Sequence, residues 1–125
     1  MIQISQKDDV KIFLLKAKKL ISKGKYDFFD KREENMKTLA ALGYKTHHMK
    51  QEILSLTPQN YFRGPTEDYD KDKHKGEYIW EFGKIIQAQE IYIKLKIRKN
   101  KGCDEIACMS FHKAQYKMTY PLKQK

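Results

Sequence analysis

A stretch of strict alternation between aliphatic and polar residues constrains the fold of this chain most. Residues 91–98 read IYIKLKIR, so every second residue is isoleucine or leucine. A repeat of two residues is typical of a β-strand with one buried face. We therefore predict a strand here with one apolar face. The opposite face should carry a phenol and three cations, namely Tyr92, Lys94, Lys96 and Arg98.

Two flanking segments alternate in the same way and extend the prediction from a strand to a sheet. In residues 77–82 three aromatic residues share one face, and Glu81 lies on the other. In residues 106–112 we expect Met109 and Phe111 on one face and His112 on the opposite one. Because glycine and asparagine favour turns, we predict connections at Gly83 and at residues 100–102.

The N-terminal half favours helices, because its apolar residues recur every three or four positions. The first helix should run from Gln6 to Lys23, with Ser5 as its N-cap. The next elements are an edge strand at 25–29 and a helix at 31–42 capped by Asp30, with its apolar side at Met36, Leu39, Ala40 and Leu42. A third helix follows, capped by Thr46 and ending near Leu54. Then come a single turn from Thr57 that Gly64-Pro65 breaks, a charged loop at 66–76, and a last strand through Tyr116, Met118 and Tyr120.

This order of elements predicts an α+β fold, with N-terminal helices packed on one face of a small antiparallel β-sheet and the other face open. We expect a single domain over residues 1–125, a length that supports one ordinary core. The chain has no run of about 20 apolar residues and no secretion signal at its start. Its two cysteines have neither metal-site nor disulfide-framework spacing. A cytoplasmic protein without membrane segment or metal is therefore expected.

The net charge of +10 is the strongest global clue to the partner. A charge of this size favours nucleic acid, an acidic protein or an anionic membrane surface. High solubility of a lysine-rich protein is the simpler alternative, and charge alone does not decide between them.

The open face of the predicted sheet collects groups that suit chemistry on a phosphate. Cleavage of RNA by its own 2′-hydroxyl needs a base, an acid and cations around the phosphorus. Glu81 and His112 form a competent base and acid near neutral pH. Arg63 and Lys94 would neutralise the phosphoryl oxygens, and no metal is required. Barnase-like microbial ribonucleases use a similar set of Glu, Arg and His on a related kind of sheet.

Each of these residues also has a purely structural explanation. Glu81 can form surface ion pairs with lysines, and a histidine at a strand end is often structural. The same face can hold RNA or DNA without cutting it, through Lys94, Lys96 and Arg98, or it can meet an acidic protein. An enzyme, a nucleic-acid-binding module and a protein-binding partner all remain open at this point.

Four segments in order carry a resemblance to a known family. LTPQNYFRGP, GEYIWEFGK, EIYIKLKI and CMSFHKAQYKMTYP resemble the MqsR family of toxins from type II toxin–antitoxin systems, and FLLKAKKLISKGKY resembles that family's first helix and strand. The resemblance implies a RelE-like fold and a metal-free endoribonuclease, an mRNA interferase. It further implies single-stranded mRNA as substrate, a cognate antitoxin as partner and no small-molecule cofactor.

Carried over one position at a time, the resemblance assigns catalytic positions to Arg63, Glu81, Tyr92 and His112. Well-known members have lysine, glutamine, tyrosine and lysine there, so only the tyrosine is identical. Histidine titrates near neutral pH, which suits an acid better than lysine does. The alternation pattern and the resemblance thus select the same positions, with Lys94, Lys96 and Arg98 as candidate RNA-binding residues.

Overall fold

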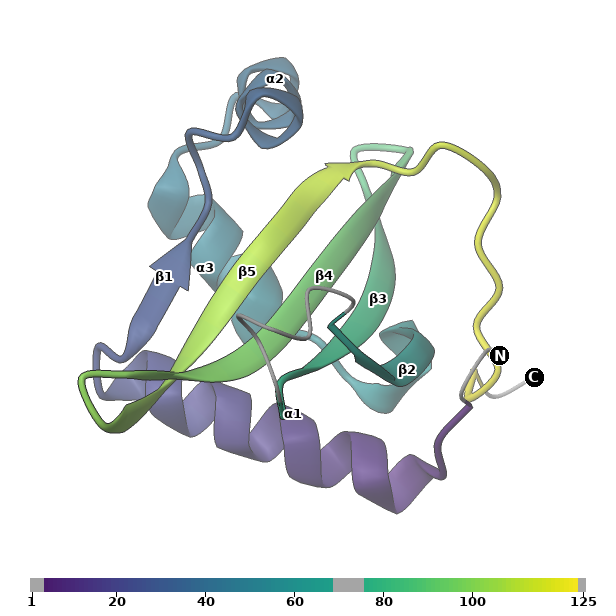
Figure 1. The fold of residues 1–125 in the computed structure, drawn as a ribbon. Helices are drawn as coiled ribbons and strands as arrows, with labels where there is room; N and C mark the ends of the chain where they lie inside the picture. The colour runs from purple at the N-terminus through teal and green to yellow at the C-terminus, as the bar shows by residue number, and fades with distance from the viewer. Residues whose placement is uncertain (1–3, 69–75, 124–125) are drawn as a thin grey trace.

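The computed structural model describes residues 4–68 and 76–123, which form helices packed against a five-stranded sheet (Figure 1). The helices are α1 (Lys7–Ser22), α2 (Glu33–Leu42) and α3 (Thr46–Leu54), with a short 3₁₀ helix, η1 (Pro58–Asn60). The strands are β1 (Tyr26–Phe28), β2 (Tyr61–Glu67), β3 (Tyr78–Ile86), β4 (Gln89–Asn100) and β5 (Cys103–Lys113). Their order in the sheet is β1-β5-β4-β3-β2, and all neighbours are antiparallel except β1 and β5. The predicted α+β fold is confirmed.

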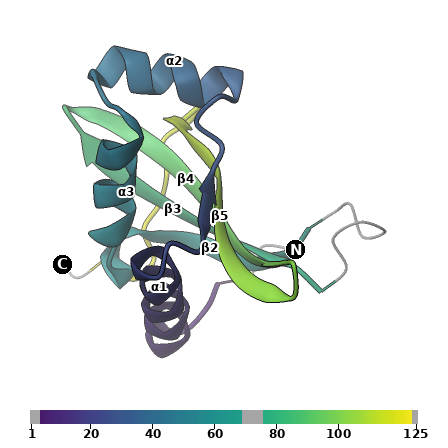
Figure 2. The same ribbon diagram turned by 90° about the vertical axis from the view of Figure 1, so that its left-hand side faces the viewer.

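The core lies between the sheet and the helices, and α1, α2 and α3 all contribute buried residues to it. Figure 2 shows α1 and α3 on one side of the sheet and α2 across its end. The alternation in β4 is confirmed, since Ile91, Ile93 and Leu95 are fully buried. On α1, Phe13 stacks on Trp80 of β3 with ring centroids 4.6 Å apart. None of the described helices combines the length and apolar character needed to cross a membrane.

Strand β5 contains a β-bulge that changes which residues face the core. Lys94 of β4 pairs with Ser110, whereas the next residue, Leu95, pairs with Cys108. Met109 is therefore the extra residue, and a single extra residue reverses the alternation beyond it. Cys108 and Phe111 both join the core, so the prediction that Met109 shares the face of Phe111 is wrong.

Helix α2 buries two residues of its predicted apolar side, Leu39 and Leu42, together with the polar residues Asn35 and Thr38. On the same predicted side, Met36 is 52% exposed and Ala40 is exposed. The side chain of Asn35 donates hydrogen bonds to the carbonyls of Phe29 (2.9 Å) and Met109 (3.1 Å) and accepts one from the amide of Phe111 (2.9 Å). Asn35 thus satisfies backbone groups of β5 just beyond the point where β1 stops pairing with it.

Two predicted N-caps are replaced by other contacts. The N-cap of α1 is Gln6, and Ser5 instead donates its hydroxyl to the carbonyl of Gly64 (2.7 Å). Helix α2 begins at Glu33, later than predicted, and Asp30 accepts a hydrogen bond from Thr46 (2.6 Å). The third helix ends at its predicted residue, but Thr46, its predicted N-cap, is its first residue, and Lys45 is the N-cap.

Three predictions in the second half are wrong. Residues 61–63 belong to β2, because Tyr61 and Phe62 are buried and the strand continues through Gly64. Gly83 lies inside β3, and the hairpin turn falls at Gln87 and Ala88, where φ is positive. No strand forms through residues 116–120. The predicted loop at 66–76 begins later than expected, since Thr66 and Glu67 belong to β2, and its residues 69–75 lie outside the described part. The turn after Asn100 is confirmed.

Candidate active site

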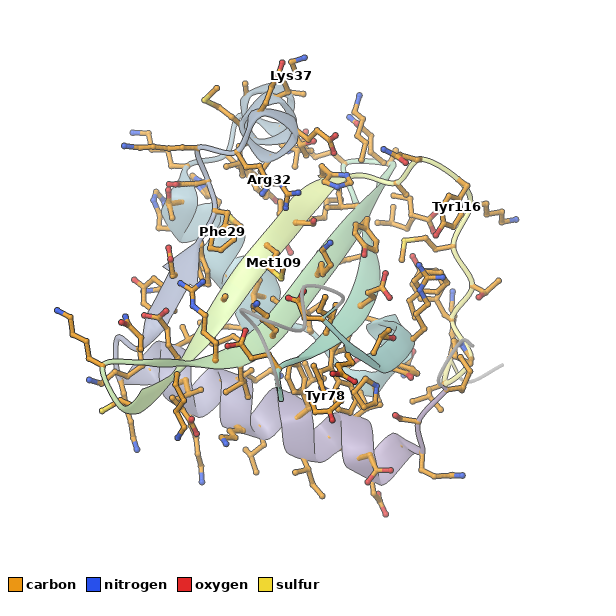
Figure 3. The ribbon with its side chains drawn as sticks, viewed as in Figure 1. Phe29, Arg32, Lys37, Tyr78, Met109 and Tyr116 are labelled. Atoms are coloured by element: carbon orange, nitrogen blue, oxygen red, sulfur yellow. The ribbon has the colours of Figure 1, made fainter. Side chains whose placement is uncertain are left out.

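A pocket of about 230 Å³ opens on the sheet face opposite the core. It draws its walls from the residue before α2, from β2, β4 and β5, and from the chain after β5. Its lining residues are Arg32, Arg63, Tyr92, Lys94, Ser110, His112, Ala114, Gln115, Tyr116 and Met118. Figure 3 shows Arg32 over β5 and Tyr116 on the other side of the sheet face. Three cations and no carboxylate stand among the described lining residues, so the pocket suits an anion.

Glu81 lies beneath this pocket and holds two of its walls in place. Its side chain is only 8% exposed, and Arg63 donates to both of its oxygens, from Nε at 2.7 Å and from Nη2 at 3.2 Å. The hydroxyl of Tyr92 donates to the same carboxylate. Such bidentate pairing orients an arginine strongly. Arg63 of β2 therefore reaches Glu81 of β3 directly, and the two residues are register partners in this antiparallel pair.

These contacts keep Arg63 charged and Tyr92 protonated. The hydrogen bond to Glu81 raises the pKa of Arg63. Burial, followed by the hydrogen bond to Glu81, raises the pKa of the Tyr92 phenol far above its ordinary value. A phenol in this state can pass a proton along but does not rest as a phenolate.

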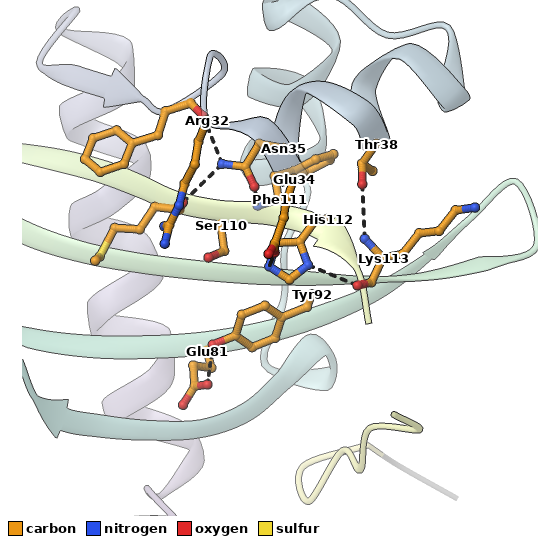
Figure 4. Close-up of polar contacts among 12 residues, drawn as sticks. Arg32, Glu34, Asn35, Thr38, Glu81, Tyr92, Ser110, Phe111, His112 and Lys113 are labelled. Atoms are coloured by element: carbon orange, nitrogen blue, oxygen red, sulfur yellow. Dashed lines mark hydrogen bonds and ion pairs between the residues drawn. The ribbon is translucent and has the colours of Figure 1, made fainter. Parts of the chain in front are cut away.

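His112 stands beside Tyr92 at the end of β5. The two residues are register partners on β4 and β5, and their ring centroids lie 5.4 Å apart. The Nδ1 atom of His112 is 3.0 Å from the carbonyl oxygen of Lys113, and Nε2 is 3.3 Å from a carboxylate oxygen of Glu34 (Figure 4). Oxygen acceptors at both nitrogens suit a ring that carries two protons, which is the form of a general acid.

Lys94 and Arg32 add positive charge on the β5 side of the pocket. Burial, and then the neighbouring charge of Arg32, lowers the pKa of Lys94 below that of an ordinary lysine. Lys94 has no hydrogen-bonding or ion-pairing partner among the described residues. Arg32 is placed by a hydrogen bond from Nη1 to the carbonyl of Met109 (2.9 Å), at the bulge of β5.

The other two predicted RNA-binding cations lie elsewhere. Lys96 is only 2% exposed, and its ammonium group pairs with Asp68 (2.9 Å) and Glu77 (2.7 Å). The prediction that Lys96 lies on an open face is therefore wrong, because these carboxylates at the end of β2 and the start of β3 cover it. Arg98 is partly exposed but pairs with Glu105 and, at 2.6 Å, with Asp27 of β1.

Sequence reasoning missed Arg32 and the residues after β5. Arg32 stands before a helix and carries no periodic or motif signal. The sequence pattern predicts a strand through Tyr116, whereas this residue lines the pocket from an irregular segment. Within the described ranges, no three His, Cys, Asp or Glu side chains gather as a metal site would need.

Comparison with known proteins places this chain in a family. Neither the curated proteins nor the solved structures contain a match to it. One family model matches residues 10–113, and it describes a motility quorum-sensing regulator that is the toxin of MqsA. The match spans most of the chain and includes Arg63, Glu81, Tyr92, Lys94 and His112. The chain therefore belongs to the MqsR toxin family, whose members are toxins of toxin–antitoxin systems.

Proposed function

We propose that this toxin is an endoribonuclease, an mRNA interferase, that cleaves single-stranded mRNA at short sequences in the pocket described above. The observation that carries the proposal is the meeting of three cations, Arg32, Arg63 and Lys94, with Tyr92 and His112 around one small cavity. A phosphodiester placed there would meet positive charge from three segments, which favours the crowded, doubly charged phosphorane of the reaction.

The base in this proposal is Glu81, acting through Tyr92. Glu81 is buried under the pocket wall, so the substrate meets the Tyr92 hydroxyl first. The 2′-hydroxyl gives its proton to the Tyr92 oxygen while the Tyr92 proton passes to the Glu81 carboxylate. The 2′-oxygen then attacks the adjacent phosphorus. The raised pKa of Tyr92 fits a phenol that relays a proton and stays neutral.

The acid in this proposal is His112. It stands next to Tyr92 on the neighbouring strand, so it can face the leaving 5′-oxygen while Tyr92 faces the 2′-hydroxyl. Proton transfer from His112 to that oxygen completes the cleavage. The products are a 2′,3′-cyclic phosphate and a free 5′-hydroxyl. Glu34, which is well exposed, is the group that the RNA would replace at Nε2.

We extend two properties from the family to this chain. The matched family description names MqsA as the protein that the toxin pairs with, and we propose a cognate antitoxin of that kind as the partner here. The mRNA substrate places the toxin in the cytoplasm. We assign no metal and no small-molecule cofactor to the cleavage itself, because the proton transfers and charge neutralisation each have a named side chain.

The proposal is tested by incubating the protein with a long mRNA in the presence of EDTA. We expect cuts at a recurring short sequence, with 2′,3′-cyclic phosphate ends. A short RNA that contains the cut site should resist cleavage when a single 2′-deoxynucleotide replaces the attacking one. Cleavage of that deoxy substrate would rule out the 2′-hydroxyl mechanism. Salt-sensitive binding without any cleavage at protein excess would instead indicate a nucleic-acid-binding module.

The lowered pKa of Lys94 predicts how RNA binding depends on pH. As pH rises, Lys94 loses its proton earlier than an ordinary lysine does, and a neutral amine no longer attracts phosphate. As the pH rises toward the ordinary lysine pKa of about 10.4, wild-type affinity should therefore fall more steeply than that of Lys94→Arg, which stays charged. The measurement is the Kd of a 2′-O-methyl RNA by fluorescence anisotropy.

Lys99→Arg is the matched control for this pH series. The hydrogen bond to Asp104 raises the pKa of Lys99, so this lysine stays charged over the same range. We expect the control to follow the wild-type curve. Parallel curves for wild type and Lys94→Arg would show that Lys94 does not contact the RNA.

A further inference from the structure

The chain after β5 lies outside the family match but forms part of the pocket. The match ends at residue 113, and the next residues contribute Ala114, Gln115, Tyr116 and Met118 to the lining. We call residues 114–120 the C-terminal strap. In Figure 1 it runs down the side of the molecule away from β1, next to β3 and β2. The pocket of this toxin therefore has a wall built from residues that the family match does not cover.

Glu90 at the start of β4 holds the strap at three points. Its carbonyl accepts a hydrogen bond from the amide of Ala114 (2.9 Å). Its carboxylate accepts one from the amide of Met118 (2.9 Å) and one from the hydroxyl of Tyr120 (2.8 Å). Met118 is only 4% exposed. These hydrogen bonds fix the position of the strap, and Tyr116 lies between its anchored ends.

Gly83 provides the surface on which the strap rests. A Cβ atom at this position would lie 2.5 Å from the hydroxyl oxygen of Tyr120 and 2.8 Å from Met118. Such distances are too short for nonbonded atoms, so a larger residue at position 83 would displace the side-chain ends of Tyr120 and Met118.

Tyr116 presents an aromatic ring at the pocket beside the arginine that is proposed to bind phosphate. It is 56% exposed, and its ring centroid lies 6.4 Å from that of Phe62. The guanidinium carbon of Arg63 stands 4.7 Å from the Phe62 ring. A nucleotide whose phosphate meets Arg63 would have its base within reach of Tyr116.

We propose that Tyr116 stacks on a nucleobase of the RNA next to the phosphate held by Arg63. The strap thereby adds a base contact to the pocket of this toxin. This inference rests on the proposed ribonuclease function. Stacking of a base on an aromatic side chain is sequence-tolerant but strong, and its removal weakens single-strand binding about 10- to 100-fold.

The test compares Tyr116→Ala with Tyr116→Phe, and uses Tyr78→Ala as the matched control. Tyr78 is a comparably exposed tyrosine, at 47%, that does not line the pocket. The probe is a single-stranded RNA that spans the cut site, with 2′-O-methyl groups to block cleavage. A second set of probes carries an abasic nucleotide at each position in turn. Fluorescence anisotropy gives the Kd of each protein variant with each RNA probe.

We expect Tyr116→Ala to bind about 10- to 100-fold more weakly, whereas Tyr116→Phe and Tyr78→Ala stay close to wild type. One abasic position should weaken binding to wild type but have no further effect in Tyr116→Ala. Equal losses in the Ala and Phe variants would indicate a hydroxyl contact and overturn the stacking proposal. Unchanged affinity in Tyr116→Ala would overturn it as well.

Two further measurements separate this inference from the ribonuclease proposal and test whether the anchored strap positions Tyr116. Wild-type cleavage of the unmodified RNA is measured alongside, and its absence refutes the ribonuclease proposal whatever the Tyr116 result. Glu90→Ala releases both side-chain anchors of the strap, so it should weaken binding as Tyr116→Ala does, and combining the two should add little. Glu90→Gln keeps an acceptor for Met118 and a polar partner for Tyr120. It should restore wild-type affinity.

Discussion

Replacing His112 with alanine should lower the rate of RNA cleavage by about 10²- to 10⁴-fold, the usual contribution of a positioned acid or base. RNA affinity should change little, because the cations of the pocket remain in place. The alanine variant leaves Tyr92 and Glu81 joined, so attack stays possible while the leaving oxygen goes without a proton. Single-turnover cleavage of a short RNA in EDTA measures the rate, and anisotropy measures the affinity.

His47→Ala is the matched control, since this histidine is exposed and lies on α3 outside the pocket. It should cleave at the wild-type rate. Cleavage by His112→Ala within about threefold of wild type would move the acid elsewhere, and Tyr92→Phe would then be the variant to examine. A folded variant that loses both cleavage and binding would assign His112 to substrate binding instead.

Replacing Asn35 with alanine should lower the free energy of unfolding by about 3 kcal/mol. Three hydrogen bonds disappear, each worth roughly 1 kcal/mol, and the amide of Phe111 is left buried without this acceptor. The carbonyls of Phe29 and Met109 lose a donor as well. Urea denaturation followed by circular dichroism gives this difference directly.

Met36→Ala on the same helix is the control, because Met36 is half exposed and is not among the buried residues of α2. Its effect should stay within about 0.5 kcal/mol. If the two variants were equally stable, α2 would be held by its leucines alone. In that case Asn35→Asp would add no information, and Leu39→Ala would test whether Leu39 holds α2 in place.

Alternation alone predicted much of the sheet, because side chains of a strand project to opposite faces in turn. It placed Ile91, Ile93 and Leu95 in the core and Tyr92 on the outer face, and the structure confirms both. Helical periodicity likewise predicted α1 and α3 to within a residue or two at each end. Both patterns depend only on local geometry, which a single sequence carries.

Long-range contacts decided the rest of the site. Alternation places Lys94 and Lys96 on the same face, yet the carboxylates of Asp68 and Glu77 cover only the second. The bulge at Met109 depends on how β5 aligns with β4. It also supplies the carbonyl that positions Arg32. None of these pairings leaves a trace in local periodicity.

The sequence by itself determined an α+β chain with a basic sheet face, and the positions of Arg63, Glu81, Tyr92 and His112 as candidates. The tertiary structure decided that Glu81 lies under the pocket and joins Arg63 to Tyr92. It also decided that Arg32 and the strap complete the pocket walls. The physical reason is that periodicity states which way a side chain points. What covers that side chain depends on segments that are distant in the chain and meet only when it folds.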